Sequence, residues 1–329
     1  MDADPLAVPA TPQRLRALRD AGVLPEAAYA RAAGIAAEPP DAATQSSFAA
    51  RGALILAGLL SLASVVFFVA HNWAGMSRWS KFGVLELGLL AFAAAAWRAK
   101  GQLTRQLSLT LCAAMLGPLL AVYGQTYQTG ADPYELFLTW ALLAAPIAAL
   151  SRFVPLWTGV WGLLNLSLVL AFEQLRPFGY EAASAAVVFT AALNVAGIAA
   201  YVLVTRRTKW LGEPLKWPVR TLAVAAAIPP LPLACWFVWQ RHWDFQYPWR
   251  LAAVATVVAL SVALPLVFRS DRFIRSTAAF AACGLGTALA MRQLNVWVDS
   301  RLEWAILGVL VVAQTSLAVW WIRGKEVTR

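Results

Sequence analysis

The chain has 329 residues, of which 60% are apolar and only 13% are charged. Ordinary soluble domains contain roughly half apolar and about a quarter charged residues, so this composition argues against a typical water-soluble enzyme domain. The net charge is +10 at pH 7, and the basic residues cluster between apolar blocks, which is typical of membrane topology. We therefore expect contact with membrane lipids and no nucleic-acid partner.

The first 50 residues differ in kind from the rest of the chain. Their apolar residues have the spacing of two short amphipathic helices and are Leu15, Leu18, Val23, Leu24 and Tyr29. Gly22 and Pro25 would separate these helices, and a Pro/Ala/Ser-rich linker follows as far as Phe48. Residues 1–50 are thus predicted to form a short cytoplasmic helical hairpin and linker. The hairpin is too small to bury a core alone, so we expect it to dock on the membrane domain or on a partner protein.

Ten apolar blocks follow, each close to the about 20 residues that a helix needs to cross the hydrocarbon of a bilayer. They cover residues 52–70, 82–97, 107–123, 135–150, 155–172, 182–205, 219–239, 251–268, 273–291 and 303–322. Membrane barrels would show short alternating apolar and polar stretches, which these blocks lack. The sequence predicts an all-α, polytopic helix bundle over residues 51–323 and a cytoplasmic tail over residues 324–329.

The positions of Lys and Arg predict the orientation, because basic loops stay on the cytoplasmic side. With ten spans, the 27 basic residues divide 20 to 7 in favour of two cytoplasmic termini. The seven on the opposite side are Arg78, Lys81, Arg176, Arg241, Arg250, Arg292 and Arg301. The densest cytoplasmic cluster, Arg206 to Arg220, is interpreted as a topology signal rather than as a specific lipid site.

The most distinctive polar stretch, residues 123–135, lies on the predicted outer side between the third and fourth spans and contains no Lys or Arg. Gln125, Tyr127, Gln128 and Asp132 in this stretch are the predicted ligand-binding residues of an outward-facing polar pocket. A structural role is the alternative to ligand binding for the two acidic residues of this stretch. Asp132 fits a helix N-cap, and Glu135 three residues later completes a capping-box pattern.

Other ionisable residues give weaker candidates. Glu86 lies inside the second span, where an ionisable group is costly and often functional, and it would complete the pocket if it reached that far. Lys81 and Arg78 precede it closely enough to pair with it, and a position at the headgroup boundary is the alternative. His71 and His242 both lie on the predicted outer side and are weak metal candidates, since the spacing indicates no third ligand.

The interior of the spans offers packing residues rather than a reaction centre. Asn165, Asn194 and Gln314 are expected to join helices through hydrogen bonds, and Pro229, Pro230 and Pro232 should interrupt the seventh span. Cys112, Cys235 and Cys283 lie in separate spans without metal-ligand spacing. No enzyme motif occurs, so no catalytic residue or cofactor is predicted, and an enzyme is less favoured than a non-enzyme.

One family likeness is carried by residues 124–132, by Leu136, Phe137, Trp140 and Pro146, and by the upstream residues His71, Asn72, Trp73 and Lys81. These residues resemble the bacterial predicted membrane proteins called domain of unknown function 2157. The likeness extends over the hairpin and about the first five spans. It implies a multi-pass protein of a bacterial inner membrane and supplies no established activity.

Two functions from different classes follow. The first is transporter-like handling of a solute or lipid through the outward-facing pocket. The alternative is a membrane sensor or assembly factor that acts through the cytoplasmic hairpin on a protein partner. An intramembrane enzyme comes third and would require Glu86, His71 and Asp132 to meet in one cavity.

Overall fold

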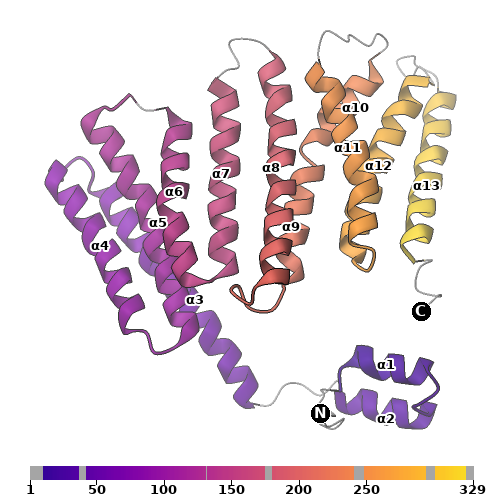
Figure 1. Ribbon diagram of the computed structural model, residues 1–329, viewed down its shortest axis with the longest axis horizontal. Coiled ribbons are helices and arrows are strands. Elements are labelled where there is room, and N and C mark those ends of the chain that lie inside the picture. The colour runs from indigo at the N-terminus through magenta and orange to yellow at the C-terminus, as the bar shows by residue number, and fades with distance from the viewer. Residues whose placement is uncertain are drawn as a thin grey trace. The chain divides into compact units, whose positions relative to one another are not determined.

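The computed structural model describes residues 10–36, 42–130, 132–174, 180–240, 248–293 and 301–323, and these residues form helices and connecting turns without strands. Figure 1 shows the helices in chain order. They are α1 Pro12–Asp20, α2 Glu26–Ala36, α3 Ala42–His71, α4 Arg78–Arg98, α5 Gln102–Tyr127, α6 Pro133–Ser151, α7 Val154–Gln174, α8 Tyr180–Arg207, α9 Lys216–Ala227, α10 Pro230–Trp239, α11 Pro248–Val267, α12 Arg272–Gln293 and α13 Arg301–Arg323. The predicted all-α class is confirmed.

The chain divides into two compact units, residues 1–60 and residues 61–329. The first unit contains α1 and α2, which are the two short helices predicted from the apolar spacing. The Thr11 side chain accepts the Arg14 N–H and so caps α1. Gly22 ends the turn after α1 with a φ of 70°, a conformation that glycine adopts without steric cost.

Ten helical segments of the described chain are long and apolar enough to cross a membrane, as the sequence predicts. The second unit exposes large apolar side chains such as Val309, Val312 and Leu317, which are 64–69% exposed on α13. Such a surface is stable in hydrocarbon and not in water. In Figure 1, α4 to α13 stand side by side, and successive crossings run in alternating directions.

Two helix ends differ from the expected ones. Helix α3 has 30 residues and begins at Ala42, so about its first third precedes the apolar block. A helix can continue from the membrane into water where its residues are polar. Helix α5 continues to Tyr127, so the predicted outer loop is shorter than residues 123–135.

The seventh span is interrupted, as its prolines predict. It consists of α9 and α10, which are separated at Ile228 and Pro229. Proline has no N–H and its ring clashes with the preceding turn, so the hydrogen-bond ladder of one continuous helix cannot pass through this segment. The span is nevertheless well packed, because Ala223, Ala226 and Ala234 are completely buried.

Two amides join α7 to α8. The Asn194 Nδ2 donates to Asn165 Oδ1 at 2.7 Å, and the Asn165 Nδ2 donates to Asn194 Oδ1 at 3.3 Å. Each amide also donates to a carbonyl of its own helix: Asn165 to that of Trp161 on α7, and Asn194 to that of Thr190 on α8. Asn194 is completely buried. The expectation that in-span amides join helices is therefore confirmed for this pair.

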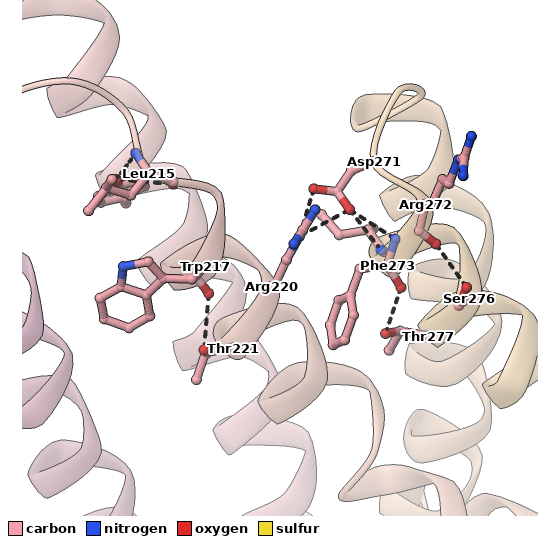
Figure 2. Close-up of polar contacts among 11 residues, drawn as sticks. Leu215, Trp217, Arg220, Thr221, Asp271, Arg272, Phe273, Ser276 and Thr277 are labelled. Carbon is pink, nitrogen blue, oxygen red and sulfur yellow. Dashed lines mark hydrogen bonds and ion pairs between the residues drawn. The ribbon is translucent and has the colours of Figure 1, made fainter. Parts of the chain in front are cut away.

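Two further polar contacts hold the C-terminal helices. The Thr287 hydroxyl donates to Gln314 Oε1 at 3.2 Å and so joins α12 to α13. The Arg220 Nε of α9 lies 3.0 Å from the Asp271 Oδ2 before α12, and Asp271 Oδ1 accepts the Phe273 N–H (Figure 2). Asp271 thus caps α12 and fixes it to α9 with the same carboxylate.

The amide pair gives a testable prediction. Asn165→Ala leaves the buried Asn194 amide without its interhelical partner, and we expect a loss of about 1 kcal/mol, since polar pairs between membrane helices contribute about 0.6 to 1.7 kcal/mol. Unfolding of the purified protein by SDS in mixed micelles measures this. A double-mutant cycle with Asn194→Ala should show coupling, and strictly additive losses would contradict the pairing.

Candidate functional site

The polar segment between α5 and α6 begins inside a helix. Gln125 and Tyr127 belong to the last turn of α5, and Gln128 ends the helix with a φ of 45°. The Gln128 N–H donates to the Gly124 carbonyl, which satisfies one of the free carbonyls at the helix end. Gln128 therefore has a defined structural role in ending α5.

Helix α6 begins at the place that its acidic residues predict, but without the predicted cap. Asp132 occupies the N-cap position and Pro133 the first turn, yet the Asp132 side chain makes no capping hydrogen bond. The Glu135 carboxylate accepts from the Tyr134 hydroxyl at 3.4 Å instead of from a backbone N–H of the cap. The reciprocal capping box is therefore not formed, and both carboxylates remain available for other contacts.

An open cavity of about 430 Å³ lies between the end of α5 and the start of α6. We call it the outer cavity after the side of the membrane that the basic residues predict for it. The polar side chains in its lining are Tyr123, Gln125, Thr129, Asp132, Glu135 and Thr139. None of the described lining residues is basic. Two carboxylates, an amide and hydroxyl groups thus converge on one small space, with acceptors in excess over donors.

A second open cavity, of about 500 Å³, lies on the other side of α5. Its lining is mainly apolar and comes from α3, α4 and α5, with Val66, Trp73 and Leu85 among its members. Gln125 and Ala121 line both cavities. Gln125 is therefore the polar side chain of α5 that two neighbouring spaces share.

The remaining predicted pocket residues lie elsewhere. Tyr127 and Gln128 are not part of the lining of either cavity. The Tyr127 ring packs 4.9 Å from the Tyr123 ring and 6.2 Å from the Phe82 ring, centroid to centroid. The structure thus places two of the four residues, Gln125 and Asp132, around one cavity and gives Tyr127 an aromatic packing role.

Glu86 lies on α4 with an exposed side chain and lines neither cavity. The basic residues expected to reach it stack on tryptophans instead. The Lys81 Nζ lies 3.7 Å from the centre of the Trp73 ring, and the Arg78 guanidinium lies 5.2 Å from the Trp79 ring. Cations on indole faces are stabilised at membrane interfaces without a carboxylate.

The histidines do not assemble a metal site within the described residues. His71 is the last residue of α3, and His242 lies outside the residues that the structure describes. Among those residues, no three His, Cys, Asp or Glu side chains gather closely enough to hold a metal ion. The outer cavity contains Asp132 without His71 or Glu86, so it does not assemble the trio that an intramembrane enzyme would need.

The two helices that form the outer cavity are held in close contact near the middle of their length. The Trp140 Nε1 of α6 donates to the Ala113 carbonyl of α5 at 2.8 Å. A Cβ at Gly117 would overlap the Trp140 ring, so only glycine fits there. The Ser167 hydroxyl of α7 donates to the Tyr134 carbonyl and fixes the start of α6. These contacts set the separation of the cavity walls.

Arg275 is an unusual residue that the sequence reasoning missed. It lies in the first turn of α12 with 4% of its surface exposed, and its Nε and Nη1 have no hydrogen-bond partner among the described residues. The sequence carried a signal, because Arg275 falls inside the predicted ninth span, where an ionisable residue is a candidate by the rule applied to Glu86. It was instead counted among the charges that set topology.

Comparison with known proteins supports the family resemblance. Residues 16–157 match the family model described as a predicted membrane protein, DUF2157. The match ends in the first turn of α7, so it covers the hairpin and four complete spans rather than about five. No curated protein and no solved structure matches the chain. The matched region includes every residue of the outer cavity.

The α5–α6 contact can be tested with a matched pair of glycines. Gly117→Ala forces the Trp140 ring away and should destabilise the protein by about 1 to 3 kcal/mol, as overpacked cores do. Gly159→Ala on α7 meets no atom within 4 Å and should be neutral or slightly stabilising. SDS-induced unfolding of both variants measures the difference, and equal stabilities would show that Gly117 does not set the helix separation.

Proposed function

We propose that this chain, which contains a DUF2157 region over residues 16–157, is a transporter-like membrane protein that handles a small solute through the outer cavity. The observation that supports this most is the presence of Asp132 and Glu135 in one open cavity, where Asp132 has no capping bond and no ion pair with any residue that the structure describes. Asp132 is half-buried and Glu135 is exposed beside the open cavity, so both carboxylates can meet a ligand there. The cavity wall also contains the apolar residues Leu120, Ala121 and Leu136, so a lipid is the alternative substrate.

The chemistry of the cavity favours a cationic or hydroxyl-bearing solute. Asp132 and Glu135 supply negative charge, Gln125 supplies a donor and an acceptor, and Thr129 and Thr139 supply hydroxyls. A small organic ammonium ion would satisfy both carboxylates through charge-assisted hydrogen bonds. The interrupted seventh span supports a transporter-like role, because discontinuous helices recur in secondary transporters.

Orientation and compartment are part of the same proposal. Basic residues are more numerous in the connections at the helix ends opposite the cavity. This excess supports an outward-facing cavity and cytoplasmic termini. The family resemblance supports a bacterial inner membrane as the location. Under this arrangement the cavity would take its solute from outside the cytoplasm.

A second function is favoured by the hairpin. Helices α1 and α2 belong to a unit separate from most of the membrane domain, and Val23 and Ile35 are each 68% exposed. Large apolar side chains exposed on a small hairpin are typical of a docking surface. A sensor or assembly factor would use this surface to bind a cytoplasmic protein.

The solute proposal predicts a charge-dependent ligand effect. Putrescine or choline should raise the thermal stability of the purified full-length protein, because a ligand that binds the folded state stabilises it. The double variant Asp132→Asn/Glu135→Gln should weaken this binding by about tenfold or more, since hydrogen bonds to charged groups contribute about 1.5 to 3 kcal/mol. A fluorescence-based melting curve in detergent measures both.

Glu86→Gln is the matched control, because it removes a carboxylate of α4 that does not line the cavity. It should respond to the ligand as the unaltered protein does. An equal response of the double variant and the unaltered protein, or no response to any cationic or hydroxylated compound, would remove the support for the proposed function.

The two functions can be separated by deleting residues 1–36, which leaves α3 intact. A self-sufficient membrane site predicts full complementation of a deletion strain by the truncated chain, with normal membrane insertion. If insertion is normal and complementation is lost, the sensor or assembly function is favoured. Immunoblotting of the membrane fraction verifies insertion in both cases.

A further inference from the structure

A second pair of cavities lies at the opposite ends of α5 and α6, near the start of α5 and the end of α6. One cavity is apolar and lies among α7, α8 and α9, and the other is polar and lies between α5 and α6. Trp210, in the turn between α8 and α9, lines both of them. The two cavities therefore adjoin at a single indole ring.

The apolar cavity has a volume of about 260 Å³ and is walled by aromatic side chains, namely Trp157, Trp161, Tyr201 and Trp210. Gly197 allows this wall to form, because a Cβ there would lie only 2.7 Å from the Trp161 ring. The Trp157 and Trp210 rings meet edge to face at 6.0 Å. Such a lining excludes ions and suits a hydrocarbon chain.

The polar cavity is larger, about 880 Å³, and carries two guanidinium groups. Arg105 lies in the first turn of α5, and Arg152 directly follows the last residue of α6, with Gln102 and Gln106 beside them. In the described part of the chain, neither Arg105 nor Arg152 has a carboxylate partner. This cavity thus holds two positive charges, and a single phosphate between them would accept charge-assisted hydrogen bonds from both.

The turn that carries Trp210 is fixed rather than loose. The Tyr201 hydroxyl accepts the Leu215 N–H at 2.9 Å and donates to the Leu215 carbonyl at 3.2 Å, which ties the end of the turn back to α8. The backbone N–H of Trp210 donates to the Thr208 hydroxyl at 3.3 Å. These bonds fix the backbone that carries the shared indole before any ligand arrives, and the ring itself packs against Trp157, which lowers the entropy cost of binding.

We propose that these adjoining cavities bind one anionic phospholipid, with its phosphate between Arg105 and Arg152 and an acyl chain in the tryptophan-lined cavity. An apolar compartment joined to a doubly cationic one complements an amphiphile with a negative head. A zwitterionic lipid would leave one guanidinium opposite its own ammonium group. A free phosphate would leave the apolar compartment unused.

The backbone of Arg152 supplies a way to separate binding from folding. Its φ of 52° lies in the left-handed region, where glycine is favoured and other residues are strained. Arg152→Gly should therefore leave the fold as stable as before or more stable, while removing one of the two charges. A loss of lipid binding in this variant cannot be attributed to unfolding.

The test is native mass spectrometry of the full-length protein released from micelles that contain phosphatidylglycerol or phosphatidylcholine with the same acyl chains. We expect one phosphatidylglycerol to be retained, and Arg105→Gln and Arg152→Gly each to weaken its binding by about tenfold. Ala200→Phe, which fills the apolar cavity, should weaken it similarly. Arg98→Gln is the matched control, because it removes an exposed arginine at the same ends of the helices and outside both cavities.

Four results would overturn the proposal. They are equal retention of the two lipids, unchanged binding in Arg105→Gln and Arg152→Gly, a loss in Arg98→Gln as large as theirs, and unchanged binding in Ala200→Phe. Displacement of the lipid by millimolar glycerol 3-phosphate would also overturn it, because the acyl chain would then contribute nothing. None of these readouts depends on the outer cavity or on its solute.

Discussion

The contact between α7 and α8 links the two groups of helices in the second unit, and the amides of Asn165 and Asn194 pair within it because hydrocarbon offers them no alternative partner. In the described chain, α7 packs against α6 on one side and α8 on the other, and α8 in turn packs against α9 and α11. The amide pair therefore joins the helices of the outer cavity to the C-terminal helices. Trp161 and Trp157 lie four and eight residues before Asn165 on α7, so the same helix face also walls the apolar cavity.

The spans were predictable because hydrocarbon thickness fixes their length and their composition. The break in the seventh span was predictable for a covalent reason, since Pro229 and Pro230 cannot continue a hydrogen-bond ladder. Helix ends were less predictable. Nothing in hydropathy requires α5 to stop at Tyr123, and the polar residues after it extend the helix by one turn into the interface. Likewise, Asp132 occupies the expected N-cap position without the expected side-chain bond, because capping depends on a rotamer that sequence does not specify.

The candidate sites show the same division. Gln125 and Asp132 were predicted to share a pocket because they are close in the chain. The same reasoning included Tyr127, because sequence does not reveal that its ring packs against Phe82. The adjoining cavities that share Trp210 could not be predicted from the sequence, for a different reason. Arg105, Arg152 and Trp210 come from three distant segments, and the ordinary rules of membrane topology already account for each one alone. Only their convergence on adjoining cavities distinguishes them from the other arginines and tryptophans near helix ends.

Both sites depend on the same two helices, because α5 and α6 form the outer cavity at one end and the polar cavity at the other. Separating these helices would break the hydrogen bond from Trp140 to the Ala113 carbonyl and would leave the Trp140 indole N–H without a partner in hydrocarbon. The Gly117 contact would be lost with it. Gln125 lines both the outer cavity and the one shared with α3 and α4, so its amide is the polar group at the boundary between the two spaces while α5 and α6 stay paired.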